Sequence, residues 1–123
     1  MKLAISIAGQ TLDSPFDARF GRADAFCLVD VDSGAWTVHA NPALSASGGA
    51  GVKAAQFVAQ LGAQAVVSGA YGPKAHHTLS AADVQPLLAP DQASCSAADI
   101  VALFKAGQLT QSGVASHAGY HGS

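Results

Sequence analysis

The first forty residues alternate apolar side chains with small or polar ones, which is the period of β-strands. Leu3, Ile5 and Ile7 share one face of residues 2–8, and similar alternation runs through residues 25–31 and 35–40. The Asp-Ser-Gly sequence at residues 32–34 joins the last two segments as a hairpin turn. The pattern therefore predicts an antiparallel meander of three strands.

After residue 50 the period lengthens to that of helices. Small or apolar residues share one face of residues 51–61, namely Gly51, Ala54, Ala55, Val58 and Leu61. Gly62 follows where such a helix would end. Residues 65–67 are continuously apolar, as in a strand that is covered on both faces. A second helix is expected to start at Pro73, because proline suits the first helical position.

A fifth strand and a third helix complete the pattern. Residues 84–88 are mostly apolar, but Pro86 predicts that this strand lies at a sheet edge, because proline has no N–H for the ladder. Apolar residues recur with helical spacing from Ala97 to Phe104, after Ser96, a common N-cap residue.

Right-handed crossovers between these elements favour one arrangement of the chain. They predict an α/β fold in which a five-stranded mixed sheet of order 3-2-1-4-5 carries three helices. We expect one domain over residues 1–111 and a flexible tail, rich in His, Gly and Ser, over residues 112–123.

The predicted topology gathers two glycine-rich loops at one rim of the sheet. Residues 45–51 and 69–74 each lead into a helix, and helix N-termini offer unpaired N–H groups that favour anions. Four cations are expected at the same rim: Arg19, Arg22, Lys53 and Lys74. The pattern predicts an anion site, and the alternative is that the glycines only make tight turns. The same loops would also suit a regulatory module that binds phosphate or a nucleotide, although the chain has no Gly-x-x-x-x-Gly-Lys-Ser/Thr motif.

Composition narrows the classes of function. The formal net charge is -2 and only 11% of residues are charged, so nucleic acid is not an expected partner. No apolar run approaches the ~20 residues that span a bilayer, and we expect a cytoplasmic protein without a membrane partner. The two cysteines lack Cys-x-x-Cys spacing and predict neither a disulfide framework nor a zinc site.

A few single side chains are candidates for metal ligation or catalysis. His76, one turn into the second helix, and Cys95, at the start of the third, are expected near the rim. The alternatives are a solvated histidine and a buried or capping thiol. A metal-dependent hydrolase would need clustered carboxylates, but Asp30 and Asp32 approach the hairpin at the opposite end of the sheet. No Ser-His-Asp or Cys-His spacing is supported either, so we expect a binding protein and not an enzyme.

An ordered set of short motifs resembles the dinitrogenase iron-molybdenum cofactor biosynthesis domain family. The set runs Phe20-Gly21-Arg22-Ala23, Asn41, Gly48-Gly49-Ala50-Gly51 and Gly72, within a match over residues 1–109. The resemblance implies a ribonuclease H-like fold and noncovalent binding of a molybdenum-containing metal-sulfur cluster.

The same resemblance suggests the composition and the binding residues of the cluster. The cluster would be a molybdenum-copper sulfide or another molybdenum-iron-sulfur cluster, and its protein donor and recipient are not identified by the sequence. Motif positions are taken by Phe20, Gly21, Arg22, Asn41, Gly48, Gly49, Gly51 and Gly72. The charge pattern adds three cations to the candidate cofactor-binding residues: Arg19, Lys53 and Lys74.

Overall fold

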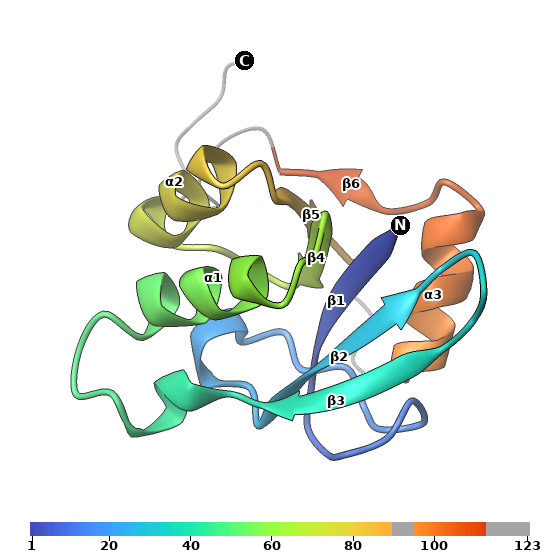
Figure 1. The fold of residues 1–123 in the computed structure, drawn as a ribbon, viewed down its shortest axis with the longest axis horizontal. Coiled ribbons are helices and arrows are strands. Elements are labelled where there is room, and N and C mark those ends of the chain that lie inside the picture. Colours follow the sequence, from blue (N-terminus) through green and yellow to red (C-terminus); the bar gives the residue numbers. More distant parts are fainter. Residues whose placement is uncertain (90–94, 113–123) are drawn as a thin grey trace.

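A six-stranded mixed sheet forms the centre of the molecule (Figure 1). The computed structural model describes residues 1–89 and 95–112. Within them the strands are β1 Lys2–Ile7, β2 Ala25–Asp30, β3 Trp36–Ala40, β4 Ala65–Ser68, β5 Gln85–Leu88 and β6 Thr110–Gln111. Their order is β3-β2-β1-β4-β5-β6, which contains the order predicted for the first five strands. β1 pairs antiparallel with β2 and parallel with β4, and β4 pairs parallel with β5.

The prediction of five strands is wrong, because β6 adds to the sheet beyond β5. Its two residues pair antiparallel with Leu87 and Leu88, and a strand of this length is too short to show a period in the sequence. Pro86 is therefore not at the edge of the sheet. Its carbonyl accepts the N–H of Ser112 at 2.9 Å, since proline lacks only the donor. Ser112, predicted to open the flexible tail, is buried, and residues 113–123 lie outside the described part of the chain.

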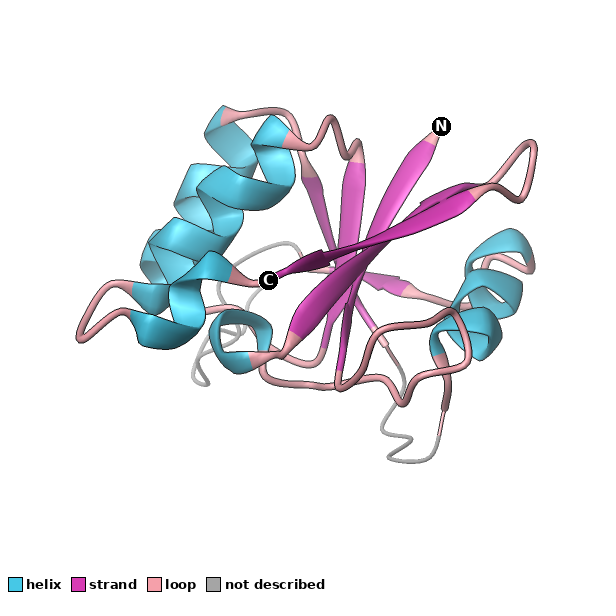
Figure 2. Ribbon diagram, turned by 60° about the horizontal axis from the view of Figure 1, so that its bottom comes forward, coloured by secondary structure: helices cyan, strands magenta, loops and turns pink. Residues whose placement is uncertain are grey.

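Helices cover both faces of the sheet (Figure 2). α1 (Ala50–Gln60) and α2 (Pro73–Ala81) pack on one face and α3 (Ala97–Lys105) on the other, so the three predicted helices are present. Two 3-10 helices, η1 (Phe20–Arg22) and η2 (Pro42–Ser45), lie in the connections before β2 and α1. None of the helices in the described residues is long and apolar enough to cross a membrane.

Capping contacts explain where these helices begin and end. Pro73 takes the first position of α2. At α3, Ser96 Oγ accepts the N–H of Asp99 at 3.2 Å, and Asp99 Oδ2 accepts the N–H of Ser96 at 3.0 Å, which forms a capping box. Gly62 and Gly107 follow α1 and α3 in the left-handed conformation, with φ of 84° and 70°. The helix starts and ends that the sequence predicts are thus confirmed by the capping contacts and by the left-handed glycines.

Alternation along the strands creates two apolar layers. Phe26 and Val66 belong to the layer under α1 and α2, and Ile5 and Val67 belong to the layer under α3. All four side chains are fully buried, and each such burial contributes about 1.5–3 kcal/mol. The two layers hold the ends of β1 and β4 and the first turns of α1 and α2 in fixed positions relative to each other.

Candidate functional site

The carboxyl ends of β1, β4 and β5 lie at one end of the sheet, which we call the carboxyl rim. Its loops are residues 8–24, 41–49 and 69–72, with residues 89 and 95–96 from the connection to α3. Ligands of open α/β sheets bind at such a rim. Every predicted cofactor-binding residue lies in these loops or in the first turns of α1 and α2.

The loop of residues 17–23, here called the anchored loop, is tied to the ends of β1 and β4. The Asp17 N–H donates to the Ser6 carbonyl at 2.9 Å, and Ser6 Oγ donates to the Asp17 carbonyl at 2.6 Å. The Gly69 N–H and the Ser68 hydroxyl both donate to the Ala18 carbonyl, at 3.1 and 3.3 Å. The loop thus extends the sheet between the two parallel strands, which makes it a rigid support.

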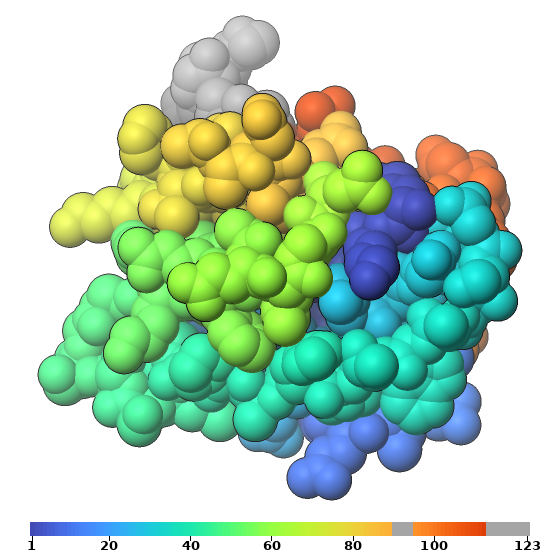
Figure 3. Space-filling view, in the orientation of Figure 1, coloured from blue at the N-terminus to red at the C-terminus, as the bar shows by residue number. Residues whose placement is uncertain are grey.

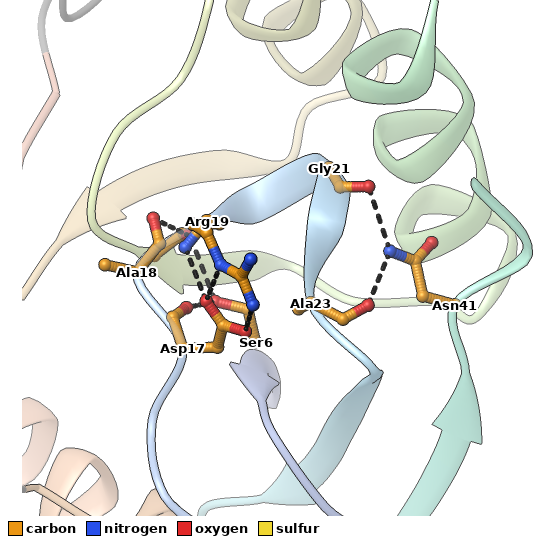
Figure 4. Close-up of polar contacts among 8 residues, drawn as sticks. Ser6, Asp17, Ala18, Arg19, Gly21, Ala23 and Asn41 are labelled. Carbon is orange, nitrogen blue, oxygen red and sulfur yellow. Dashed lines mark hydrogen bonds and ion pairs between the residues drawn. The ribbon is translucent and has the colours of Figure 1, made fainter. Parts of the chain in front are cut away.

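Arg19 is held by a carboxylate of its own loop (Figure 4). Its Nε and Nη2 donate to Oδ1 and Oδ2 of Asp17 at 3.0 and 2.9 Å, as a bidentate pair. The Asp17 side chain is 6% exposed and that of Arg19 is 70% exposed. The hydrogen bonds from Arg19 lower the pKa of Asp17, so the carboxylate stays charged. Because this charge balances that of Arg19, the pair attracts an anion less than a free arginine would.

Asn41 links the anchored loop to the segment that precedes α1 (Figure 4). The residue is 4% exposed. Its Oδ1 accepts the Ala43 N–H at 2.9 Å, and its Nδ2 donates to the carbonyls of Ala23 at 2.9 Å and Gly21 at 3.3 Å. The oxygen and both amide protons are thus used inside the protein, so Asn41 positions two segments of the rim.

An aromatic cluster supports the anchored loop. The ring of Phe20 is buried, and its centroid lies 5.1 Å from that of Tyr71 and 5.6 Å from that of Phe26. The Tyr71 hydroxyl lies 2.7 Å from the Leu87 carbonyl and 2.9 Å from the Val66 carbonyl. Burial raises the pKa of Tyr71, so this hydroxyl stays a donor. Sequence reasoning missed Tyr71, and the available signal was a large aromatic residue between two loop glycines.

The first turns of α1 and α2 meet at the carboxyl rim. A Cβ atom built on Gly51 would lie 3.2 Å from the Cβ of Ala75, and one built on Gly21 would lie 3.1 Å from the Gly51 nitrogen. Small residues at these positions therefore let α1, α2 and η1 approach one another closely. Figure 1 shows α1 and α2 running side by side from this end.

Backbone N–H groups at this meeting point lack acceptors among the described residues. They belong to Ala50, Gly51, Val52, Lys74 and Ala75, and we call them the amide cluster. The N-cap residues Gly49 and Gly72 have no side chain that could accept these bonds. Since the positive ends of two helix dipoles coincide here, the amide cluster favours an anion.

Three exposed cations belong to the elements that meet at the amide cluster. Arg22 lies in η1, Lys53 in α1 and Lys74 in α2, and none of them makes an ion pair within the described residues. No atom lies within 4 Å of a Cβ atom built on Gly48 or Gly72. The backbone beside the cations is therefore open to a ligand.

The two side chains predicted to ligate metal lie in separate places. His76 Nε2 is 2.9 Å from the carbonyl oxygen of Ser112, on the α2 face of the sheet. Cys95 is half-buried before α3, on the other face, and its carbonyl accepts the Phe16 N–H. In the described ranges, no group of three or more His, Cys, Asp or Glu side chains could hold a metal ion. Burial also raises the pKa of the Cys27 thiol to about 11, which disfavours the thiolate that metal binding requires.

The acidic residues considered for hydrolysis lie at the end of the sheet away from the rim. Asp32 Oδ2 is 2.8 Å from the amino group of Met1, and Asp30 Oδ1 is 3.9 Å from it. Both carboxylates thus face a cation instead of forming a metal site, so the geometry gives the hydrolase alternative no support.

The fold and the rim together have the features of an α/β domain that binds anions noncovalently. The family model described as dinitrogenase iron-molybdenum cofactor matches residues 1–107. The chain therefore belongs to the dinitrogenase iron-molybdenum cofactor family.

Solved structures of similar proteins agree with this assignment. The apo form of the orange protein from Desulfovibrio gigas is 33% identical, with a TM-score of 0.88 over 94% of this chain and 96% of that one. A NifB-like protein from Thermotoga, of the DUF35 family, is 27% identical, with a TM-score of 0.80 over 96% and 98%. The protein PH0822 is 20% identical, with a TM-score of 0.73 over 92% and 97%, and bears on the fold alone. Comparison with curated proteins gives no match.

Family and neighbours support a role in handling metal clusters related to the iron-molybdenum cofactor. They also favour a cluster carrier or a biosynthetic factor over an ordinary enzyme.

Proposed function

We propose that this protein binds and carries, or helps to assemble, a molybdenum-containing metal-sulfur cluster at its carboxyl rim. The cargo we infer is a mixed molybdenum-copper sulfide, held noncovalently. The similarity to the orange protein supports cluster handling, and the composition of the cluster is our extension. The observation that carries the proposal is the amide cluster beside three unpaired cations, in described residues that offer no set of metal-ligating side chains.

The chemistry of the rim suits an anionic cluster that brings its own sulfur ligands. Such a cargo needs positive charge, N–H donors and shielding from water, but no protein thiolate. Arg22, Lys53 and Lys74 would supply the charge, and the amide cluster would supply the donors. A shielded hydrogen bond to a charged group contributes about 1.5–3 kcal/mol, so several together can hold a cluster without a covalent bond.

The buried motif residues would act by positioning these groups. Phe20 and Asn41 set the place of η1 against the start of α1, and Asp17 restrains Arg19 beside them. We infer carriage without turnover, and protein partners that deliver and receive the cluster. A cytoplasmic location and a ribonuclease H-like classification remain predictions.

Reconstitution of the apo-protein with tetrathiomolybdate and copper(I) tests the proposal. Wild type is compared with the double variants Cys27→Ser/Cys95→Ser and Lys53→Gln/Lys74→Gln, by visible absorbance and metal content. We expect the cysteine variant to keep the chromophore and the lysine variant to bind at least about tenfold more weakly. Lys105→Gln, in α3, is the control for the loss of one cation.

The reverse result would contradict the proposal. Loss of the chromophore in the cysteine variant, with wild-type affinity in the lysine variant, would indicate direct thiolate ligation. Displacement of the chromophore by inorganic phosphate or ATP at micromolar concentration would favour the phosphate- or nucleotide-binding alternative.

A further inference from the structure

The loop of residues 69–72 joins β4 to α2 and enters the first turn of that helix. At one end, the Gly69 N–H donates to the Ala18 carbonyl of the anchored loop at 3.1 Å. At the other end, the Gly72 carbonyl accepts the His76 N–H at 3.0 Å, which is the first hydrogen bond of α2. The position of this loop therefore decides where α2 begins.

Tyr71 is the residue of this loop whose side chain enters the core. It is 2% exposed, whereas the other three residues of the loop are exposed. Its hydroxyl lies 2.7 Å from the Leu87 carbonyl in β5 and 2.9 Å from the Val66 carbonyl in β4. A carbonyl oxygen can accept a second hydrogen bond besides that of the strand ladder, so the hydroxyl bridges two adjacent strands.

The hydroxyl of Tyr71 is not needed to fill the core. The other rings of the aromatic cluster, Phe20 and Phe26, are also buried and carry no hydroxyl. Burying a hydroxyl is unfavourable unless it is hydrogen-bonded, and here both bonds run to rigid strands. A phenylalanine ring in this place would be free to tilt and slide, whereas the tyrosine is held at its backbone and at its hydroxyl. The hydroxyl thus serves the orientation of the loop.

The orientation of this loop affects how the first turns of α1 and α2 meet. Figure 3 shows that the surfaces of the two helices adjoin on one face of the molecule. A Cβ atom built on Gly51 would lie 3.2 Å from the Cβ of Ala75, so the contact leaves little space for adjustment. Lys74 and Ala75, whose N–H groups belong to the amide cluster, follow Tyr71 by three and four residues. A shift of Tyr71 would therefore move these donors relative to those of α1.

We propose that Tyr71 is a positioning residue for the amide cluster: by bridging β4 and β5, its hydroxyl fixes the first turn of α2, so that the N–H groups of both helices converge on one anionic cluster. This inference rests on the proposed function and adds the residue that sets the geometry of the site. Tyr71 would act without contacting the ligand, because its side chain is buried. A site that is ordered in advance loses less entropy on binding, so removal of the hydroxyl should lower affinity.

Hydrogen exchange of two matched amides tests the local effect of Tyr71→Phe without a ligand. The His76 N–H makes the first hydrogen bond of α2, and the Lys53 N–H, which donates to the Gly49 carbonyl at 3.0 Å, makes the corresponding bond of α1. Because the variant keeps the ring and loosens only α2, we expect exchange about threefold faster or more at His76 and unchanged exchange at Lys53. A general loss of stability would affect the two amides alike.

Titration of folded protein with tetrathiomolybdate, followed by calorimetry, tests the consequence for binding. We expect the affinity of Tyr71→Phe to fall about three- to tenfold, because the donors of α2 are no longer held in place. Ile100→Val is the matched control, since it removes a methyl group from the buried layer under α3, on the other face of the sheet. This control should lose stability and keep wild-type affinity.

Three results would each contradict the inference. They are a change in exchange at His76 no greater than that at Lys53, wild-type affinity in Tyr71→Phe, and an equal loss of affinity in Ile100→Val. Failure of wild type to bind tetrathiomolybdate would contradict the proposed function and, with it, the role of Tyr71 in binding. In that case, faster exchange at His76 alone would still support the positioning of α2 by Tyr71.

Discussion

The anchored loop and the amide cluster are neighbours at the carboxyl rim, but they use their polar groups in opposite ways. In the anchored loop, the Asp17 carboxylate and the carbonyls of Ala18 and Ala23 all have partners inside the protein. In the amide cluster, the donors have no acceptor among the described residues. One region thus uses its polar groups inside the protein and the other leaves backbone donors unused, so changes in the first should alter stability and, on the proposed function, changes in the second should alter binding.

Replacing Asn41 should have the largest effect on stability. Asn41→Ala removes the acceptor of the Ala43 N–H and the donor to the Ala23 carbonyl, both in a buried place. Since each unsatisfied group costs about 1–3 kcal/mol, we expect a loss of about 2–4 kcal/mol in the free energy of unfolding. Urea denaturation measures it, with Ser45→Ala, exposed at the end of η2, as the control. A loss below about 0.5 kcal/mol would show that the link is dispensable.

The Asp17–Arg19 pair should make the free energy of unfolding depend on pH in the acid range. Arg19 lowers the pKa of Asp17 below its ordinary value of 3.8, so the pair contributes fully above about pH 4 and is lost as pH falls through the folded-state pKa. Asp17→Asn should cost about 1.5–3 kcal/mol at pH 7 and flatten the stability profile below about pH 4.

Denaturant unfolding between about pH 7 and pH 2 measures this prediction. Asp13→Asn, an exposed residue earlier in the same connection, is the control. Parallel acid limbs in wild type and Asp17→Asn would mean that the pair does not contribute to the pH dependence.

Gly51→Ala should lower ligand affinity slightly while leaving the stability of the protein almost unchanged. The added methyl group meets the Cβ of Ala75 at 3.2 Å and would move α1 from α2 by a few tenths of an ångström. The higher helix propensity of alanine offsets part of this cost, so stability should change by less than about 1 kcal/mol. We expect affinity for tetrathiomolybdate to fall about threefold, as measured by titration calorimetry. Unchanged affinity would mean that the spacing of the two helix starts is not critical.

The elements that were predicted from sequence are those set by local signals. Pro73 and Ser96 mark the starts of α2 and α3, because each acts through contacts within its own first turn. The strand order followed from the handedness of crossovers. β6 was missed because two residues carry no period, and the position of Pro86 was wrong because its carbonyl still accepts a bond from Ser112.

The candidate site was predicted in outline, and its internal contacts were not. The glycine spacing located the helix starts of the amide cluster. From the sequence, Arg19 and Arg22 are equivalent cations, but only Arg19 lies beside a buried carboxylate, Asp17. That difference arises from the bonds that fix Asp17 between β1 and β4, and these contacts join residues far apart in the chain.

The most direct test of the central claim compares the affinity for tetrathiomolybdate of Lys74→Gln and Arg19→Gln, measured by titration calorimetry at low salt on folded protein. Each variant loses one positive charge at the same rim. The account predicts a loss of about tenfold for Lys74→Gln, because this cation is unpaired beside the amide cluster, and of about threefold or less for Arg19→Gln, because Asp17 already balances its charge. A larger loss in Arg19→Gln than in Lys74→Gln would contradict the division of the rim into a supporting loop and a binding cluster.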